Sequence, residues 1–328
     1  MYFFALSGFM ILASIALIFF WNLNLWIDMT WGIQIEFQAW TWSINLDTIK
    51  SEAQTVAGHM NLQKENIVNT INVYKISGQE SFVVEAGISK KYSDAETESY
   101  KIAYREQLSE NLKSQGYVLS SYVNIGASFG DYIKSTAKLT LLLALIGISL
   151  YVAYAFSGTV AGIPSLTFAF ITLLTLFHDV IVSTGLYILT SQFFPQFQID
   201  TFFITALLTI LGYSINDTIV IFDRIRTNLR EFAGKWKNLE TIIIDSIDET
   251  MTRSIYTSLT VFFVLLCMFF FGPESIQWFT LTMLFGTIVW SLSSIFVASP
   301  LLYEMHKHTT LTAYVKKEAR SDEDKMVV

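Results

Sequence analysis

Six long apolar runs constrain the fold of this chain more than any other feature of its sequence. A helix needs about 20 mostly apolar residues to cross the hydrocarbon core of a membrane. The runs are Phe3–Trp21, Leu139–Phe156, Ile163–Thr190, Thr201–Phe222, Ile255–Phe271 and Ile276–Tyr303. Only 15% of the 328 residues are charged, whereas an ordinary soluble domain has about 25%. The sequence therefore predicts a polytopic α-helical membrane protein with six transmembrane helices.

The first apolar run is predicted to be a retained membrane anchor and not a cleaved secretion signal. No Lys or Arg precedes it, and the bulky residues Trp21 and Trp26 follow where a cleavage site needs small side chains. We therefore assign residues 1–22 to the first membrane helix and residues 137–304 to a membrane domain that holds the other five.

Basic residues outside the apolar runs predict the orientation of the chain. Six of the 21 Lys and Arg residues lie in segment 223–253 and five in the tail 305–328, whereas the turns 191–200 and 272–275 hold none. Nine more lie in segment 23–136, but long domains cross the membrane largely regardless of their charge. Cytoplasmic segments of membrane proteins carry an excess of Lys and Arg. The N-terminus, the 223–253 loop and the tail are therefore predicted to be cytoplasmic, and segment 23–136 is predicted to lie outside the cytoplasm.

The outer segment is predicted to fold as an α+β domain, because alternating apolar stretches flank polar ones that carry helix caps and glycine breaks. The predicted elements are a strand over Gly32–Ala39, a helix capped by Asp47 and ending near Met60, strands over Val68–Ile76 and Ser81–Ala86 joined by a turn at 77–79, a helix over Asp94–Ser114 and a strand over Tyr117–Val123. This strand–helix–strand–strand–helix–strand order is that of a ferredoxin-like sandwich.

Polar side chains form one stripe on each of four predicted membrane helices, at about 100° per residue. The stripes are Ser165, Thr172, Thr175, Asp179, Ser183 and Thr190; Thr205, Thr209, Gly212, Tyr213 and Asn216, with Asp217 at the edge; Arg253, Thr257 and Thr260; and Thr280, Thr287, Ser291 and Ser294. A charged side chain at bilayer depth costs roughly 2.5–3.5 kcal/mol and needs a specific reason. We expect all four stripes to turn inward, toward one another or toward a narrow water path.

These stripes contain the candidate functional residues. The predicted proton pathway consists of Asp217, Arg253, Asp179 and Asn216, with Ser214, Thr218, Thr209 and His178 as polar neighbours on the helix seams. A carboxyl group in a dry bundle can gain a proton from one side and lose it to the other, because burial and a nearby Arg shift a pKa in opposite directions. Moving one charge through the membrane field is worth about 2.3 kcal/mol per 100 mV. The residues therefore predict a proton-driven conformational cycle.

Each of these residues also has a purely structural interpretation. Ser and Thr stripes commonly hold membrane helices together. Asp217 can form a static ion pair, Arg253 can extend to the lipid headgroups, and Asp179 can act as a fixed hydrogen-bond centre with His178. These alternatives stay open from the residues themselves.

Motifs for covalent or cofactor chemistry are not found. The single cysteine, Cys267, excludes an intrachain disulfide and a paired-cysteine metal site, and we expect it to be a small apolar side chain in a buried helix. The pair Gly234-Lys235 lacks the upstream glycine and the following Ser or Thr of a nucleotide-binding loop. No basic stripe indicates nucleic acid. We therefore expect no enzyme activity, no cofactor and no metal.

One block of the sequence is specific enough to indicate a family. The stretch Gly-Tyr-Ser-Ile-Asn-Asp-Thr at 212–218, followed by Phe-Asp-Arg-Ile-Arg at 222–226 and Asn-Leu-Arg at 228–230, closely resembles the SecF family of bacterial protein-export subunits. Further similarities are His178-Asp179 with Gly185-Leu186, Thr250 with Arg253 and Ser254, the stretch Ser293–Pro300, and Asp28–Gly32. Two positions depart from the family pattern: Trp31 replaces a glycine, and Ala127 replaces a proline.

The resemblance implies a function and a set of partners. Members of the SecF family belong to the resistance–nodulation–division superfamily and act in the bacterial inner membrane with SecD, often with YajC, beside the SecYEG channel and the ATPase SecA. They use the proton gradient to help pull or release unfolded exported polypeptide on the outer side. Asp217 and Arg253 match the family's proton-pathway positions, and Asp179 is a weaker candidate.

Three functional hypotheses follow. The first is a SecF-type energy converter, which needs a second six-helix half because proteins of this superfamily pair two such halves. The second is an assembly scaffold, in which the polar residues only hold the helices to SecD and no proton moves. The third is half of a proton-driven small-solute exporter, for which an outer domain of this size is small.

Overall fold

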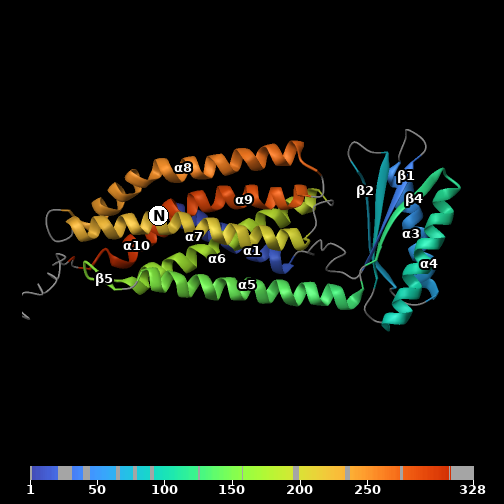
Figure 1. The fold of residues 1–328 in the computed structure, drawn as a ribbon, viewed down its shortest axis with the longest axis horizontal. Coiled ribbons are helices and arrows are strands. Elements are labelled where there is room, and N and C mark those ends of the chain that lie inside the picture. The colour runs from blue at the N-terminus through green and yellow to red at the C-terminus, as the bar shows by residue number, and fades with distance from the viewer. Residues whose placement is uncertain are drawn as a thin grey trace, which may run out of the picture.

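The computed structural model describes residues 2–20, 32–39, 45–63, 67–76, 80–88, 92–124, 126–156, 158–194, 199–232, 237–273, 276–309 and 311. The chain forms a long helix bundle and, beyond one end of it, a smaller domain with a sheet and two helices (Figure 1). Trp31, Asp28 and the predicted turn at 77–79 lie outside the described residues.

The bundle contains the predicted membrane helices. They are α1 (Tyr2–Phe20), α5 (Ala127–Ala155), α6 (Ser165–Phe193), α7 (Thr201–Phe232), α8 (Leu239–Phe271), α9 (Gln277–Ser293) and α10 (Ser299–His306). Five helical stretches in the described residues are long and apolar enough to cross a membrane: 131–155, 165–193, 201–232, 239–271 and 277–306, the last of which includes α10. The apolar part of α1, Phe4–Phe20, is shorter than these five.

The segment predicted as a loop, 223–253, is helical over most of its length. Helix α7 continues to Phe232, and α8 begins at Leu239, where Asn238 caps it by accepting a hydrogen bond from Thr241 N at 2.9 Å. Hydropathy marks only the part of a helix that lies in the apolar layer of the membrane, so a helix that extends beyond this layer is predicted to be too short. The same reason explains why α5 begins at Ala127 and not at the predicted Leu139.

The last predicted span is interrupted by a π-helical segment. Residues Ser294–Ala298 form this segment between α9 and α10, and Pro300 lies in the first turn of α10. Proline cannot donate a main-chain hydrogen bond to the preceding turn. A change of helical pitch before Pro300 accommodates that missing bond.

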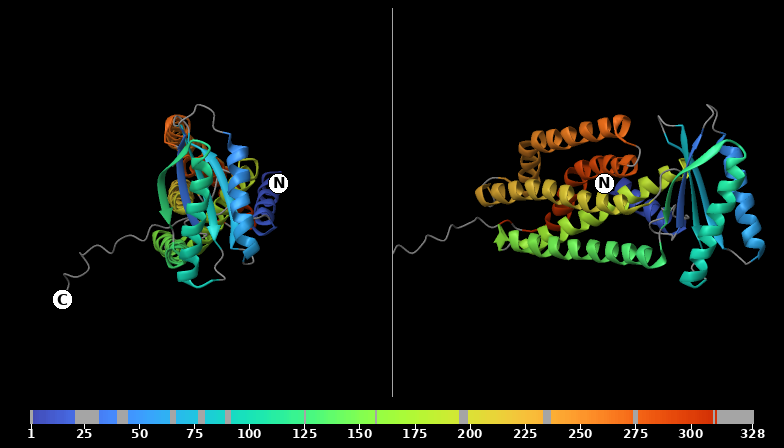
Figure 2. Two further views of the ribbon diagram at one scale, coloured as in Figure 1. Left: turned by 90° about the vertical axis from the view of Figure 1, so that its right-hand side faces the viewer. Right: turned by 45° about the vertical axis from the view of Figure 1, so that its right-hand side comes forward.

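The outer domain has the element order that the sequence predicts. Its elements are β1 (Gly32–Ala39), α3 (Leu46–Gln63), β2 (Val68–Lys75), β3 (Ser81–Ile88), α4 (Asp94–Lys113) and β4 (Tyr117–Asn124). The four strands form one antiparallel sheet in the order β2-β3-β1-β4. Helices α3 and α4 cover the face of the sheet that is turned away from the bundle (Figure 2).

The caps of the two outer-domain helices differ in how well the sequence predicted them. Helix α4 begins with a capping box in which Ser93 and Glu96 exchange hydrogen bonds. For α3 the predicted cap, Asp47, is wrong: Asn45 Oδ1 accepts hydrogen bonds from the Asp47 and Thr48 amides at 3.1 and 3.2 Å. Both residue types cap helices well, so the sequence did not decide between neighbouring candidates.

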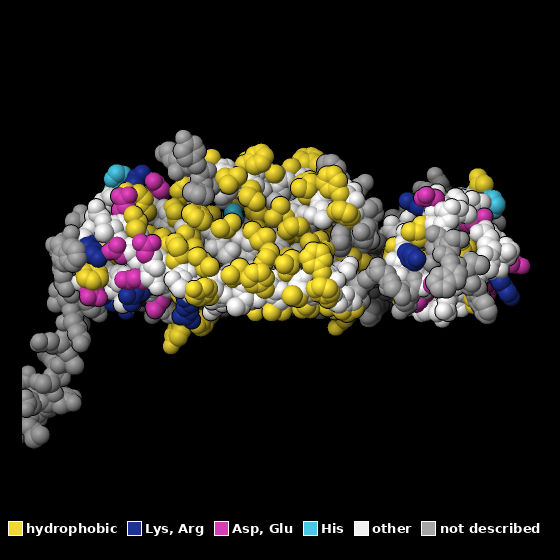
Figure 3. All heavy atoms as spheres, turned by 90° about the horizontal axis from the view of Figure 1, so that it is seen from above, with side chains coloured by type: hydrophobic (Ala, Val, Ile, Leu, Met, Phe, Trp, Pro, Cys, Tyr) yellow, Lys and Arg dark blue, Asp and Glu magenta, His cyan; other side chains and the backbone are white. Residues whose placement is uncertain are grey.

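The helices of the bundle differ in how deeply they are buried. Helices α6, α7 and α9 form its interior, whereas much of α5 and α8 faces outward. On the face of the bundle that Figure 3 shows, apolar side chains cover most of the surface, and charged side chains gather at the end away from the sheet domain. Cys267 is exposed on α8, so its predicted burial is wrong. The cause is the peripheral position of α8, which apolarity by itself does not reveal, because both lipid-facing and buried surfaces are apolar.

Candidate functional site

A buried carboxylate on α6 forms the first part of the candidate site. The side chain of Asp179 is 0% exposed. Its Oδ2 accepts hydrogen bonds from Ser214 Oγ of α7 at 2.6 Å and from Ser293 Oγ of α9 at 2.8 Å. Its Oδ1 lies 2.8 Å from Nδ1 of His178. Three helices therefore meet at a carboxylate that has the hydrogen bonds a buried charge requires.

A second buried carboxylate lies on α7. Asp217 is 9% exposed, and its Oδ2 accepts a hydrogen bond from Ser294 Oγ, at the start of the π-helical segment. Because Ser293 and Ser294 are consecutive, one turn of the last span contacts the carboxylates of two other helices. Single π-helical turns occur frequently at functional sites.

A small cavity lies beside Asp217, between α7, α8 and α9. Its volume is about 20 Å³, enough for a single water molecule. It is lined by Tyr213, Asn216, Asp217, Val220, Arg253, Ser254, Thr257, Ser258 and Trp290. The rings of Tyr213 and Trp290 stack beside it with centroids 5.1 Å apart. Three of the four predicted proton-pathway residues, Asn216, Asp217 and Arg253, thus border one cavity.

Arg253 itself is exposed. Among the described residues it forms no ion pair with Asp217, which is bonded to Ser294 instead. The fourth predicted residue, Asp179, does not line the cavity. Its partner Ser293 is followed in the sequence by Ser294, which donates to Asp217. The structure therefore divides the predicted pathway into a cavity side, at Asp217, and an interior side, at Asp179.

Two of the four predicted stripes face inward and two do not. In α6, Thr172, Thr175 and Ser183 are buried, as are Thr280 and Thr287 in α9. The expectation is wrong for α7 and α8, where the following stripe residues are exposed: Thr205, Gly212, Tyr213, Asn216, Arg253, Thr257 and Thr260. Thr209 of the same stripe is half-buried. Among the described residues nothing covers that side of α7 and α8, which leaves a polar strip on an otherwise apolar surface.

Most of the stripe hydroxyls bond to their own helix and not to a neighbour. Thr172 donates to Phe168 O at 2.8 Å, Thr209 to Thr205 O at 2.9 Å and Thr287 to Met283 O at 2.8 Å. These threonines satisfy their hydroxyls locally. Ser214, Ser293 and Ser294 differ from them because each donates to a carboxylate on another helix. Thr218, also predicted as a seam residue, is buried.

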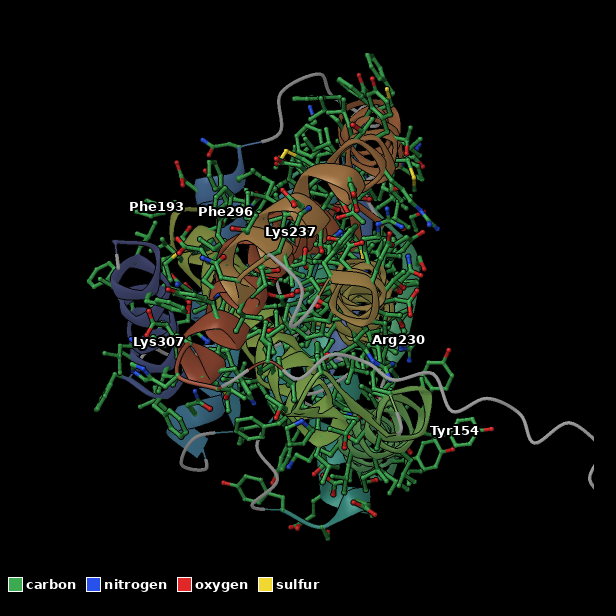
Figure 4. The ribbon with its side chains drawn as sticks, turned by 90° about the vertical axis from the view of Figure 1, so that its left-hand side faces the viewer. Tyr154, Phe193, Arg230, Lys237, Phe296 and Lys307 are labelled. Atoms are coloured by element: carbon green, nitrogen blue, oxygen red, sulfur yellow. The ribbon has the colours of Figure 1, made fainter. Side chains whose placement is uncertain are left out.

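Charged residues join α7 to α8 at the end of the bundle away from the sheet. Arg224 pairs with Glu249, and Asn228 Nδ2 donates to Ser246 Oγ and Glu249 Oε2, each at 2.9 Å. Arg230, Lys237 and Lys307 are seen from this end in Figure 4. The basic part of the motif at 222–230 thus connects helices, and the sheet lies beyond the opposite end (Figure 1).

Some site residues were not found from the sequence. Ser293 was not assigned to the stripe of its helix, although it neighbours Ser294, because 100° spacing places consecutive residues on different faces. Trp290 was also missed, and Ser254, which is buried beside the cavity, was named only for its similarity to the family and not as a site residue. The serine pair Ser293-Ser294 inside an apolar run was the available signal.

The fold and the site define a multi-pass helical membrane protein with two buried carboxylates, each of which accepts a hydrogen bond from a serine of the last span. The family model "Protein export membrane protein SecD/SecF, C-terminal" matches residues 105–308. The chain is 34% identical to the protein translocase subunit SecF of Calditerrivibrio nitroreducens, over 92% of this chain and 90% of that protein. It belongs to the SecF family.

Further relatives agree with this assignment. The SecF of Helicobacter pylori strain J99 is 31% identical over 97% of this chain and 90% of its own length. Among solved structures, the translocon-associated membrane protein SecDF from Thermus thermophilus has a TM-score of 0.72 and 25% identity, over 92% of this chain. A second SecDF structure, in a super-membrane-facing form, has a TM-score of 0.59. This chain spans 37% of the SecDF chain.

Proposed function

We propose that this chain is a SecF-type subunit that uses the proton gradient, together with SecD, to assist protein translocation across or into the bacterial inner membrane. Membership of the SecF family supports the role in translocation. The buried, cavity-lining carboxylate of Asp217 supports the use of protons. Its outer domain acts on unfolded exported polypeptide in this proposal.

The proposed topology has six spans, with α1 as the first. The sheet order β2-β3-β1-β4 and the βαββαβ element order support a ferredoxin-like outer domain, over residues 23–136. Because basic side chains gather at the end of the bundle opposite to the sheet, both termini are cytoplasmic and the sheet domain is outside. The membrane helices occupy residues 1–22 and 137–304, and the tail 305–328 is cytoplasmic.

The carboxyl group of Asp217 is the proposed proton carrier. It lines a cavity of about 20 Å³ with Asn216 and the guanidinium-bearing Arg253. Because Asp217 has no ion pair with Arg253 among the described residues, a static pair is the less favoured role. A water molecule in this cavity would let a proton reach Asp217 from the α8 side. Once Asp217 is neutral, the positive charge of Arg253 would repel a further cation that enters the cavity.

The polar strip on α7 and α8 is the proposed docking face for SecD. Its residues include Thr205, Asn216, Arg253 and Thr257, which are exposed at positions that lie within apolar helices. Polar groups at this depth need a protein or water partner. The solved relative named SecDF has more than twice the length of this chain, which supports a second half of similar size. SecYEG, YajC and SecA stay predictions from the family resemblance.

Protein export by inverted membrane vesicles tests the proton role. Asp217→Asn keeps the size of the side chain but cannot bind and release a proton, so the stimulation of export by a proton gradient should fall at least tenfold. Asp248→Asn, an equal change at an exposed position of α8, should leave it unchanged. Gradient-stimulated export that survives in Asp217→Asn would refute the proposal.

The same vesicles distinguish the scaffold hypothesis. If the polar residues only hold SecF to SecD, Asp217→Asn should lower the amount of SecD that co-purifies in mild detergent, and export per remaining complex should stay normal. The proton hypothesis expects a normal amount of complex and low export per complex. Export must therefore be divided by the amount of complex in each vesicle preparation.

A further inference from the structure

Ser254 of α8 has a buried hydroxyl group that forms no hydrogen bond with any described residue. The residue is 3% exposed and lines the cavity beside Asp217. Within the described part of the chain, no other residue of this cavity has a buried side-chain oxygen or nitrogen without a partner. Buried polar groups in folded proteins are almost always hydrogen-bonded, so the position of this hydroxyl needs a specific explanation.

Neighbouring hydroxyls of α8 show that Ser254 is not satisfied in the usual local way. A Ser or Thr inside a helix commonly donates to the carbonyl oxygen one turn earlier. Thr250 donates in this way to Ser246 O at 2.8 Å, and Thr257 donates to Arg253 O at 2.7 Å. Ser254 lies between these two threonines in the sequence and forms no such bond. Its hydroxyl is therefore available to a group inside the cavity.

The group that bonds to Ser254 has to be small. Arg253 and Thr257 line the same cavity but are exposed, and they belong to the proposed docking face for SecD. Ser254 is buried, so a side chain of a docked protein would have to enter a space of about 20 Å³ to reach it. A space of this volume holds one water molecule.

The cavity also offers the polar groups that a bound water molecule needs, which are usually two to four. Asp217 has one hydrogen bond with the described residues, from Ser294 to its Oδ2, and a carboxylate can accept several. Asn216 and Ser258 line the same cavity with side chains that can donate or accept. Together with Ser254, these groups surround a space for one water molecule with hydrogen-bonding partners.

We propose that Ser254 is a positioning residue, whose hydroxyl holds a water molecule that donates a hydrogen bond to the carboxylate of Asp217. The water site rests on the geometry of the cavity. Its role, as the last carrier of a proton on the way to Asp217, rests on the proposed function. In that role the water receives one proton from the α8 side, releases another to the carboxylate oxygen and remains a water molecule, while Ser254 keeps its own hydrogen.

The bound water would join two helices, because Asp217 belongs to α7 and Ser254 to α8. Ser254 directly follows Arg253, and consecutive residues of a helix point about 100° apart. This spacing allows Arg253 to be exposed and Ser254 to be buried at the same cavity. A movement of α8 away from α7 would break the bridge and disconnect Asp217 from the α8 side.

An experimental structure of the SecD-containing complex in lipid, at a resolution that shows ordered water, tests the site itself. We expect one water molecule within hydrogen-bond distance of both Ser254 Oγ and a carboxylate oxygen of Asp217. Ser254→Ala should lose this water. Thr250→Val is the matched control and should keep it, because Thr250 is a buried hydroxyl of the same helix that donates to its own helix and does not line the cavity.

A wild-type cavity without water, or a Ser254 hydroxyl bonded to another protein atom, would overturn the proposal. The wild-type structure decides this even if Ser254→Ala fails to assemble with SecD.

Proton entry into vesicles that contain the same complex tests the role of the water. Ser254→Ala should lower the rate per complex about fivefold, the factor that corresponds to one hydrogen bond of average strength, and Thr250→Val should keep the wild-type rate. A wild-type rate in Ser254→Ala would overturn the role of Ser254, and a low rate in Asp217→Asn would then leave the proposed function intact. Wild-type rates in both Ser254→Ala and Asp217→Asn would overturn the proposed function as well.

Discussion

Gly185 of α6 and Ser14 of α1 are in such close contact that a Cβ atom on the glycine would lie 2.2 Å from the serine Oγ. The same Cβ would lie 2.7 Å from Ser14 Cα, so rotation of the side chain would not relieve the clash. Small residues allow membrane helices to pack closely in this way. This contact attaches α1, the helix that leads into the outer domain, to the helix that carries Asp179.

Gly185→Ala should therefore weaken the packing of α1 onto α6. Overpacking a close contact costs about 1–3 kcal/mol, so the thermal midpoint of the purified complex in mild detergent should fall. Gly147→Ala on α5 is the matched control, because a Cβ there meets nothing within 4 Å and alanine favours helix over glycine. Equal midpoints for the two variants would contradict the close contact.

Arg226 should not tolerate replacement by lysine. This buried residue of α7 lies over the rings of Phe156 at 5.0 Å and Phe168 at 5.9 Å, and its Nη1 donates to Ala155 O at 3.4 Å. A planar guanidinium stacks on rings and a lysine ammonium does not. Arg226→Lys should cost about 1 kcal/mol or more.

Detergent-induced unfolding measures this loss, with Arg230→Lys as the control, because Arg230 is exposed on the same helix. The control should unfold as the wild type does. If Arg226→Lys and Arg230→Lys both unfold at the wild-type detergent concentration, the ring contacts of Arg226 contribute nothing measurable to the contact between α5, α6 and α7.

Lys101 predicts a pH dependence for the outer domain. This buried lysine of α4 donates to Asn124 Oδ1 at 2.8 Å, at the end of β4, and desolvation lowers its pKa below the usual 10.5 while Glu98 opposes the shift. A lowered pKa means that the folded state binds the proton more weakly than the unfolded chain does. The resulting loss of stability is fully present below the folded-state pKa and disappears as the pH rises to 10.5.

The difference in unfolding free energy between the wild type and Lys101→Met should thus shift in favour of the wild type across that alkaline interval. This difference is measured by urea unfolding of the outer domain within the full chain at several pH values, with susceptibility to proteolysis as the signal of unfolding. A difference that stays constant with pH, or that shifts the other way, would show that burial does not govern the charge of Lys101.

Those parts of the fold that follow from local rules were predictable. The need to satisfy the backbone in lipid makes each long apolar run a helix, and five of the predicted runs correspond to helices that can cross a membrane. Alternation of apolar residues predicted β1, whose observed bounds, Gly32–Ala39, equal the predicted ones. The exact ends of α5, α7 and α8 were not predictable, because their polar extensions carry no apolar signal.

The site was only partly predictable, because it depends on contacts between distant helices. Asp179 and Asp217 were found as charges inside apolar runs, and both are buried. Their partners Ser293 and Ser294 meet them only because α9 packs against both α6 and α7. The exposure of Asn216 was not predicted, and that of Arg253 was predicted only as an alternative, because a helical stripe shows which residues share a face but not whether the neighbour of that face is in the same chain.

Proton movement through the reconstituted SecD-containing complex tests the role of Asp217 most directly. A pH-sensitive dye trapped in the vesicles reports acidification when a proton gradient is imposed. We predict that the wild type and Asp248→Asn acidify the vesicles at equal rates, and that Asp217→Asn lowers the rate at least tenfold to that of vesicles without the complex. Acidification by Asp217→Asn at the wild-type rate would contradict the account, because protons would then cross without this carboxyl group.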